Sequence, residues 1–278
     1  MKKEKSKKRL DLLLVEKNLI ATRSRAKAEI MAGNVLVNGI KRDKPGEAVS
    51  SGAKIEILAT QNPYVSRGGL KLEKALHEFG LNLENKIVLD IGASTGGFTH
   101  CVLKHGAQKV YALDVGYGQL DWKLRHEPRI VNLERFNVRH LKREDLQELP
   151  HLATIDVSFI SLRLVLPVVA GLFIPEIVCL VKPQFEAKPA QVGKKGVVKN
   201  AAVHQEVLEN IVATSLQLSY RVEGLTFSPL KGPQGNIEYF LYLCAEKAVD
   251  SDEKQVKVED LSPVINPVIT QAHYILGR

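Results

Sequence analysis

The residues best suited to catalysis are charged side chains at the ends of apolar, strand-like segments. Lys182 directly follows the apolar run 177–181, where the chain would leave a buried sheet. Asp156 and Glu238 stand at the ends of two other strand-like segments, and the helix predicted after residue 66 adds Lys71, so the set is Lys71, Asp156, Lys182 and Glu238. One such residue alone would most often belong to a surface ion pair. In an open parallel sheet, however, ligands bind beyond the carboxyl ends of the strands, so four charged residues at one edge predict a catalytic set.

The chemistry that this set could perform is activation of a weak nucleophile such as a hydroxyl group. A hydroxyl attacks efficiently only when a positioned group removes or shares its proton. A lysine with its ordinary pKa of ~10.4 is protonated at neutral pH, but burial and a second lysine can bring its pKa toward ~7–8. The carboxylates oppose that shift while they orient the amine. We therefore predict that Lys182 is the base or steers the nucleophile, and that the other three residues set its charge and position.

A glycine-rich segment, DIGASTGGFT at 90–99, follows the strand-like residues 87–89. Its spacing differs from the G-x-G-x-x-G pattern of dinucleotide sites, and its carboxylate, Asp90, suits a zwitterionic or cationic ligand. An isolated glycine cluster could equally form a tight strand-to-helix turn. Asp114, however, ends the next strand 22 residues after Gly92, near the offset of ~20 residues at which an acid meets ribose hydroxyls. The loop and this acid together predict a nucleoside cofactor.

Strand-like and helical patterns alternate through most of the chain. Strands are predicted at 86–91, 109–113, 129–133, 153–157, 175–181, 220–227 and 237–245, and helices at 67–80, 97–105, 117–126, 161–173 and 201–218. This alternation is typical of a doubly wound, mostly parallel α/β sheet of the Rossmann-like kind. The loop between the last two strands is too short for a crossover helix, so these two strands should pair antiparallel.

Positive charge is concentrated in the first 58 residues, which hold 14 Lys and Arg against 7 Asp and Glu, or +7 of the formal net charge of +8. A lysine-rich terminus is often only a solvated tail. Here the basic residues continue into patterned sequence, which favours binding to RNA or DNA phosphates. The pattern predicts two short helices that begin near 10 and 22, a strand at 34–39 that enters an Asn-Gly hairpin turn, and a closing strand at 54–58.

The composition of the 278 residues is ordinary for a globular protein, with 45% hydrophobic and 25% charged residues. The three cysteines lie in apolar stretches without Cys-x-x-Cys spacing, which indicates reduced thiols and neither disulfides nor a metal site. The longest uncharged apolar run, 164–175, is shorter than the ~18 residues of a membrane span. The basic N-terminus lacks the features of a secretory signal. We therefore expect a cytoplasmic protein without membrane association.

Three N-terminal motifs occur in the order that characterises a known RNA-binding domain. They are R-L-D-x-x-L, the segment TRSRAKAEI, and G-x-V-x-V-N-G. Over residues 9–58 the chain resembles the alpha-L, or S4-type, domain shared by a small-subunit ribosomal protein and many pseudouridine synthases. The resemblance implies that RNA contacts the basic residues Arg9, Arg23, Arg25, Lys27, Lys41, Arg42 and Lys44.

The pattern D-x-G-A-x-x-G-G-F at 90–98 resembles that of FtsJ-type ribose methyltransferases. The segments VSRGGLKL, DVGYGQL, DVSFISL, LVKPQFE, VGKKGVV and GNIEYF also stand in the order of the TlyA family, the hemolysin A-like ribosomal RNA cytidine-2′-O-methyltransferases. The chain resembles this family over 9–245. The resemblance implies a seven-stranded methyltransferase sheet and the catalytic set named above. It also implies an S-adenosyl-L-methionine site at Asp90, Gly92, Ala93, Ser94, Gly96, Phe98, Asp114 and Asn137.

The activity that this resemblance implies is 2′-O-methylation of cytidine in ribosomal RNA or a ribosomal subunit, by a monomer. The sequence Lys182-Pro183-Gln184-Phe185, where base-amino methylases typically have Asn-Pro-Pro-Tyr, also favours oxygen as the acceptor. Two alternatives stay open. A hemolytic toxin would require a spanning or cationic amphipathic helix or an export signal, none of which is evident. An RNA-binding scaffold without catalysis would be expected to have lost the charged set.

The expected organisation has four parts: an S4-like RNA-binding domain at 8–58, a linker at 59–66, an FtsJ-like methyltransferase domain at 67–246 and a tail at 247–278. The tail is charged and then proline-rich, and we expect it to be disordered. Further RNA contacts are expected at Arg67, Lys188, Lys194 and Lys195, although the loop 186–199 could also be ordinary solvated surface. Where the family has Glu-Arg-Thr-Asn this chain has Glu-Arg-Phe-Asn, so the resemblance does not carry a role over to position 136.

Overall fold

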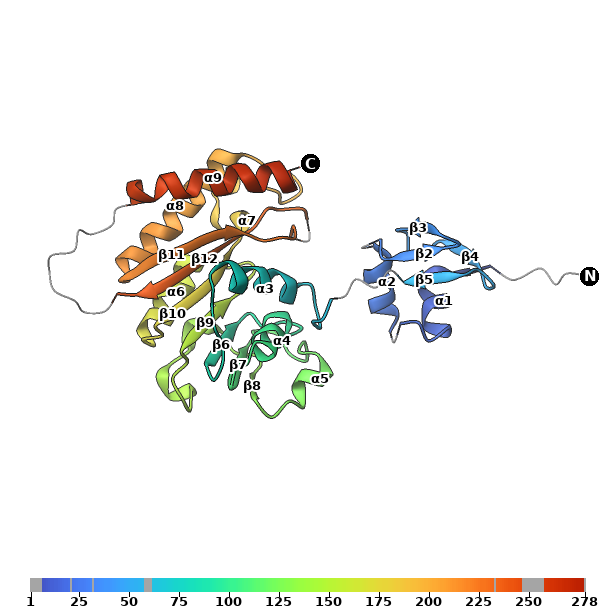
Figure 1. The fold of residues 1–278 in the computed structure, drawn as a ribbon, viewed down its shortest axis with the longest axis horizontal. Coiled ribbons are helices and arrows are strands. Elements are labelled where there is room, and N and C mark those ends of the chain that lie inside the picture. Colours follow the sequence, from blue (N-terminus) through green and yellow to red (C-terminus); the bar gives the residue numbers. More distant parts are fainter. Residues whose placement is uncertain are drawn as a thin grey trace, which may run out of the picture. The chain divides into compact units, whose positions relative to one another are not determined.

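The chain divides into two compact units, Met1–Asn62 and Pro63–Arg278 (Figure 1). The computed structural model describes residues 7–20, 22–31, 33–57, 62–232, 234–246 and 258–277. Each unit has a hydrophobic core of its own.

The first unit packs two short helices against small antiparallel sheets. Its elements are β1 (Lys7–Arg9), α1 (Leu10–Glu16), α2 (Arg23–Met31), β2 (Val35–Val37), β3 (Ile40–Arg42), β4 (Ala48–Ser50) and β5 (Ile55–Ile57). The order β3-β2-β5 forms one sheet and β1 pairs with β4. Asn38 and Gly39, between β2 and β3, have φ of 53° and 78°, as a two-residue hairpin turn requires. The predicted hairpin is confirmed, whereas the pairing of β1 with β4 was not predicted.

The second unit is built on a seven-stranded sheet with the order β11-β12-β10-β9-β6-β7-β8. Its strands are β6 (Ile87–Ile91), β7 (Lys109–Leu113), β8 (Ile130–Leu133), β9 (Leu152–Ile155), β10 (Glu176–Val181), β11 (Tyr220–Phe227) and β12 (Tyr239–Ala245). All pairings are parallel except those of β12, which runs antiparallel to both neighbours. The predicted parallel sheet with one antiparallel strand is therefore confirmed.

Helices cover both faces of this sheet (Figure 1). One face carries α3 (Gly68–Glu78), α4 (Gly97–Lys104) and α5 (Trp122–Arg125); the other carries α6 (Leu162–Gly171), α8 (Ala201–Gln217) and α9 (Val258–Leu276). Short turns complete the unit: α7 (Pro183–Glu186), η1 (Val138–His140), η2 (Arg143–Asp145) and η3 (Pro189–Gln191). The alternation along β6 explains the two layers, because Leu89 and Ile91 join one cluster and Val88 joins the other.

Two predicted elements differ from the structure. The helix predicted at 117–126 is reduced to α5, because Gly118 has φ of 70° and the side chain of Asp121 accepts a hydrogen bond from the backbone of Lys123 and so begins the helix there. The tail expected to be disordered contains α9 at its described residues. There Ile265, Ile269 and Ala272 are buried in the same cluster as the sheet.

The prediction for the tail was wrong for α9 because its two prolines obscured a helical pattern. Pro263 and Pro267 both lie on the exposed side, while the apolar residues that pack inward recur at helical spacing. His273 of α9 places its Nε2 3.1 Å from Nδ1 of the buried His204 on α8. The helix is thus fixed by apolar contacts and by a polar contact with a buried histidine.

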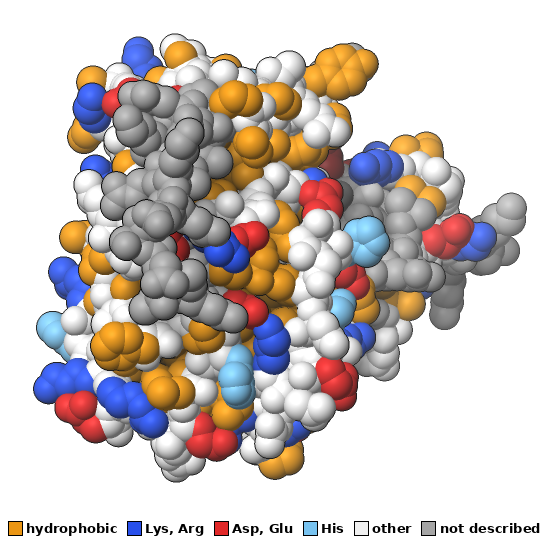
Figure 2. Space-filling model, turned by 60° about the vertical axis from the view of Figure 1, so that its left-hand side comes forward, with side chains coloured by type: hydrophobic (Ala, Val, Ile, Leu, Met, Phe, Trp, Pro, Cys, Tyr) orange, Lys and Arg blue, Asp and Glu red, His pale blue; other side chains and the backbone are white. Residues whose placement is uncertain are grey.

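The surface of the second unit is mixed in charge. On the face that Figure 2 shows, blue, red and apolar side chains are interspersed among the described residues. Nowhere in the described part of the chain is a helix both long and apolar enough for a membrane crossing. Within those same residues, no group of three or more His, Cys, Asp or Glu has the arrangement of a metal site.

Candidate active site

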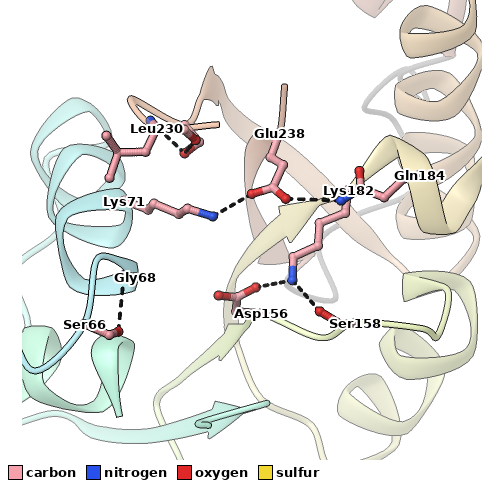
Figure 3. Close-up of polar contacts among 10 residues, drawn as sticks. Ser66, Gly68, Lys71, Asp156, Ser158, Lys182, Gln184, Leu230 and Glu238 are labelled. Carbon is pink, nitrogen blue, oxygen red and sulfur yellow. Dashed lines mark hydrogen bonds and ion pairs between the residues drawn. The ribbon is translucent and has the colours of Figure 1, made fainter. Parts of the chain in front are cut away.

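The four charged residues predicted to form a catalytic set meet at one edge of the seven-stranded sheet (Figure 3). Asp156 follows β9, and Lys182 follows its parallel neighbour β10. Glu238 precedes β12, which runs antiparallel to β10, so the start of β12 lies beside the end of β10. Lys71 reaches the same edge from α3, although it lies 167 positions from Glu238 in the sequence.

Lys182 is held by two groups of the segment after β9. Its Nζ lies 2.7 Å from Oδ1 of Asp156 and donates a hydrogen bond of 2.9 Å to Oγ of Ser158. The side chain of Lys182 is 11% exposed and that of Asp156 is 22% exposed. An ammonium group that is largely shielded from water needs such partners. Asp156 and Ser158 therefore fix the direction of the amine.

Lys71 and Glu238 form a second, more deeply buried ion pair. Nζ of Lys71 lies 2.6 Å from Oε2 of Glu238, whose side chain is only 1% exposed. The other carboxylate oxygen, Oε1, accepts a hydrogen bond of 3.2 Å from Nε2 of Gln184. Because Gln184 stands two residues after Lys182, Glu238 connects the helix that carries one lysine with the segment that carries the other.

Glycines allow the loop after β6 to lie against these segments. Gly92 has φ of 85°, and a Cβ there would be 2.5 Å from the carbonyl oxygen of Asp156. A Cβ at Gly97 would be 2.2 Å from Oγ of Ser66 and 3.0 Å from the backbone nitrogen of Gly69 at the start of α3. A side chain at either position would push these segments apart. The glycine loop therefore adjoins both the Asp156 segment and the helix of Lys71.

Asp114, at the end of β7, lies beside the same loop. Its Oδ2 accepts a hydrogen bond of 2.8 Å from the backbone of Ser94, and its Oδ1 accepts one of 2.7 Å from the backbone of Gly116. Each carboxylate oxygen has a further lone pair, so Asp114 can still accept hydrogen bonds from ribose hydroxyls. Asn137 accepts a hydrogen bond of 3.1 Å from the backbone of Arg139 in the turn after β8. This donor and acceptor chemistry fits the expected nucleoside cofactor.

Asp90 and Phe98 occupy the core rather than the surface of the loop. Asp90 is 0% exposed, and its oxygens accept hydrogen bonds from the hydroxyls of Thr99 at 2.5 Å and Thr154 at 3.0 Å. Burial raises the pKa of Asp90 to about 7, against the lowering effect of the two threonines. Phe98 packs against Phe240 with ring centroids 6.1 Å apart. The direct side-chain contact with a ligand that the sequence predicted for Asp90 does not follow from this geometry, because its side chain is fully buried beneath the loop.

In the first unit, two of the basic residues expected to contact RNA share one buried carboxylate. Arg9 donates to both oxygens of Asp11 at 3.0 Å, and Arg23 donates to Oδ2 at 3.0 Å. The hydrogen bond from Arg9, helped by Arg23, lowers the pKa of Asp11 to about 2. The arginine side chains are 47% and 49% exposed, whereas that of Asp11 is 0% exposed. Both guanidinium groups therefore reach solvent from a fixed anchor.

The remaining basic residues are mostly exposed and less constrained. Lys27, Lys41 and Lys44 of the first unit are exposed, and so are Arg67, Lys194 and Lys195 of the second. Arg42 forms an ion pair of 2.8 Å with Glu47, and Lys188 forms one of 2.9 Å with Glu206. The side chain of Arg25 lies outside the described residues.

Four residues that belong to these arrangements were not predicted. Ser158 and Gln184 each stand two positions beyond a predicted residue, and that spacing within DVSFISL and LVKPQFE was an available signal. Asp11 was part of the R-L-D motif, but its role emerges only when α1 and α2 pack together. Phe159 had no sequence signal. It is 91% exposed with φ of 65°, and its ring lies 5.0 Å from that of Phe185.

Comparison with known proteins agrees with this architecture. Residues 64–245 match the family described as FtsJ-like methyltransferase, and residues 8–55 match the S4 domain. The solved structure of a Streptococcus thermophilus protein, described as a hemolysin, is 43% identical and has a TM-score of 0.76, with 98% of each chain covered.

Curated relatives are similar over most of their length. YqxC of Bacillus subtilis, described as an rRNA methyltransferase, is 52% identical over 240 residues, which is 85% of each chain. Hemolysin A of Brachyspira hyodysenteriae is 43% identical and covers 84% of this chain and 98% of its own. The 16S/23S rRNA (cytidine-2′-O)-methyltransferase TlyA of Mycobacterium tuberculosis is 42% identical over 84% of this chain and 89% of its own. The chain therefore belongs to the TlyA, or hemolysin A-like, family of methyltransferases, which join an S4 domain to an FtsJ-like domain.

Proposed function

We propose that this methyltransferase transfers a methyl group from S-adenosyl-L-methionine to the 2′-hydroxyl of a cytidine in ribosomal RNA. The observation that carries the proposal is the convergence of two lysine–carboxylate pairs beside the glycine loop: Lys182 with Asp156, and Lys71 with Glu238. The names of the relatives from Mycobacterium tuberculosis and Campylobacter jejuni, both rRNA (cytidine-2′-O)-methyltransferases, support the same substrate.

In this proposal the residues of the chain orient the acceptor hydroxyl and manage its proton. The amine of Lys182 contacts the 2′-oxygen: as an ammonium group it donates a hydrogen bond that steers the hydroxyl, and as a neutral amine it takes the hydroxyl proton. Asp156 and Ser158 keep the amine in one direction. Lys71 and Glu238 neutralise each other's charge at the same edge of the sheet. The loop 92–96 and Asp114 would hold S-adenosyl-L-methionine, which would supply an electrophilic methyl group on its sulfonium. Much of the acceleration comes from alignment of the 2′-oxygen with the methyl carbon, because the entropy cost of orienting the two reacting groups has already been met on binding.

An aromatic pair beside Lys182, formed by the exposed Phe159 and the half-buried Phe185, supports a nucleobase as part of the substrate. Phe159 directly follows Ser158, and its backbone is in the left-handed region that bulky residues avoid. Strained backbone of this kind clusters at functional sites. The rings of Phe159 and Phe185 offer a stacking surface for an unstacked base of single-stranded RNA. In the proposal, Phe159 therefore holds the base of the target cytidine.

The test compares Lys182→Met with a matched variant, Lys86→Met, in the full-length chain. Lys86 also pairs with a glutamate, Glu176, but at the opposite edge of the same sheet. Ribosomal RNA and ribosomal subunits from cells that lack the gene are incubated with labelled S-adenosyl-L-methionine, and 2′-O-methylcytidine is mapped. We expect Lys182→Met to lower the turnover rate by about 10³-fold, the scale of losing an acid–base group, and Lys86→Met to keep nearly full activity.

Two outcomes would contradict the proposal. If the unaltered chain adds no 2′-O-methylcytidine to RNA or subunits, the proposed reaction is not its activity. If it does so and Lys182→Met is equally active, the reaction stands but the role of Lys182 does not. An RNA-binding scaffold without catalysis would give the first outcome while still retaining RNA.

A further inference from the structure

The first unit contains an ion-pair arrangement that the proposed reaction does not require. Asp11 lies on α1 with two arginines around it, Arg9 from the end of β1 and Arg23 from the start of α2. Its carboxylate accepts four hydrogen bonds, because Oδ1 also accepts one of 3.1 Å from the backbone of Leu12. The hydrogen-bonding capacity of this carboxylate is therefore fully used by groups of the protein itself.

The two arginines, by contrast, have hydrogen-bond donors that Asp11 does not use. Arg9 binds Asp11 through Nε and Nη2, and Arg23 binds it through Nε. A guanidinium group has five N–H donors in a fixed plane, so each arginine retains donors that its bond to Asp11 does not use. Both side chains are about half exposed, at 47% and 49%. The trio has a net charge of +1, with the positive groups outermost.

The guanidinium group of Arg9 also lies against Gly46. A Cβ at Gly46 would lie 3.2 Å from Nη1 and 3.4 Å from Cζ of Arg9, so the guanidinium lies against the bare backbone of this turn. The turn itself is tied to α1, since Asp11 donates its backbone N–H to the carbonyl of Pro45 at 3.0 Å. Arg9 is thereby fixed between the carboxylate and the turn, and it has lost most of the freedom of an ordinary surface arginine.

We propose that Asp11 is a positioning residue that organises Arg9 and Arg23 as a clamp for one backbone phosphate of the RNA. Two fixed guanidinium groups can donate several charge-assisted hydrogen bonds to one phosphate, and little side-chain entropy is lost on binding because both groups are already oriented. The inference rests on the proposed function only in taking RNA as the ligand. It concerns binding, and methyl transfer plays no part in it.

For the effect of Asp11→Asn on RNA affinity, the clamp and simple charge attraction predict opposite results. Asp11→Asn keeps the shape of the side chain but removes one negative charge from a surface that binds a polyanion. If Arg9 and Arg23 acted only through their charge, this substitution would tighten RNA binding. If Asp11 positions them, RNA binding weakens, and we expect a loss of about tenfold, the scale of one charge-assisted hydrogen bond.

Matched variants of the full-length chain separate these cases. Glu16→Gln removes a carboxylate from the same helix, where Glu16 forms an exposed pair of 2.7 Å with Lys8, and it should leave binding unchanged or slightly tighter. Arg9→Lys keeps the charge but loses the planar fork, so it should weaken binding several-fold. In an Arg9→Gln/Arg23→Gln background, Asp11→Asn should produce no further loss, because the residues through which it acts are absent.

The measurement is equilibrium binding of each chain to ribosomal RNA from cells that lack the gene, at a temperature well below every measured unfolding midpoint. Binding by Asp11→Asn that is as tight as that of the unaltered chain, or tighter, overturns the clamp. A loss that persists in the double-glutamine background also overturns it, since that result marks a general effect on the fold. If the unaltered chain binds this RNA without methylating it, the proposed reaction fails while the clamp is still tested.

Discussion

Two aspartates, one in each unit, have completely buried side chains, but their pKa values are shifted in opposite directions. Asp11 and Asp90 are both 0% exposed. The pKa of Asp11 is lowered to about 2, whereas burial raises that of Asp90 to about 7. The difference lies in what covers each carboxylate: two half-exposed guanidinium groups in the first case, and two threonine hydroxyls within the core in the second. Cations that cover a carboxylate keep it ionised, while neutral groups in a dry core leave its charge unfavourable.

The same contrast separates the cations of the two units. The first unit leaves Arg9 and Arg23 half exposed around their anchor, which suits attraction of a polyanion. The second unit shields Lys71 and Lys182 against carboxylates, which suits the positioning of a reacting group. We therefore expect salt-sensitive recognition from the first unit and salt-insensitive, geometry-dependent chemistry from the second.

The largest effect should come from breaking the buried pair of the second unit. Lys71→Met leaves the carboxylate of Glu238 buried without its cation, and we expect the free energy of unfolding to fall by about 4 kcal/mol. Adding Glu238→Gln to Lys71→Met should restore most of that stability but not methyl transfer. Urea unfolding followed by circular dichroism measures the first effect, and the methylation assay measures the second.

The matched control removes an exposed pair from the first unit. Lys8→Met breaks the ion pair with Glu16, whose side chains are 43% and 50% exposed, and it should cost less than about 1 kcal/mol. Equal losses for Lys8→Met and Lys71→Met would mean that burial does not determine how much each ion pair contributes to stability.

A second effect should appear in the pH dependence of stability. The folded pKa of Asp90, about 7, exceeds the ordinary value of 3.8, so the unfolded chain loses this proton first as the pH rises. The contribution of Asp90 to stability is therefore full below pH ~4 and is lost as the pH rises through ~7. Asp90→Asn should remove this dependence and raise the free energy of unfolding above pH 7 by roughly 2 to 4 kcal/mol relative to the unaltered chain.

In the first unit, the contribution of Asp11 to stability changes with pH in the opposite direction. The folded pKa of Asp11 lies below 3.8, so its contribution to stability is present above pH ~4 and is lost as the pH falls toward ~2. His204, whose pKa burial lowers to about 4, adds a loss of stability as the pH falls from 6.5. Because several groups change stability with pH, the test is the difference in free energy of unfolding between Asp90→Asn and the unaltered chain, measured across pH. A flat difference curve for Asp90→Asn would contradict the assignment.

The smallest effect concerns recognition by stacking. Phe159→Ala should raise the KM for RNA about tenfold, since stacking of one base contributes ~1–3 kcal/mol. This factor should be the same at low and physiological salt, whereas the effect of Arg9→Gln should shrink as salt rises. Phe173→Ala is the control, because Phe173 is also exposed, at 86%, with φ of 58°, but precedes β10 at the far end of that strand. A salt-dependent loss for Phe159→Ala would place it among the electrostatic contacts.

The sequence by itself determined the order of the strands in the second unit and the identity of the charged set. Strand and helix periodicities are local, and a sheet covered on both faces has nearly continuous apolar strands, so the strands of the second unit were predicted closely. The short loop before β12 sufficed to predict its antiparallel direction, and hence that Glu238 would meet the end of β10. The failure at α9 has a local cause too, because exposed prolines interrupt a pattern that only its packed side reveals.

Only the tertiary structure decided which partner each charged residue has. Lys182 pairs with Asp156 and Lys71 with Glu238, and the sequence allowed either assignment because ion-pair distances depend on how strands and helices pack. The same reason explains Asp90 and Asp11, which are both aspartates in recognisable motifs. The fold encloses one with threonines and covers the other with arginines, and that environment, which composition and spacing do not encode, sets the charge each carries.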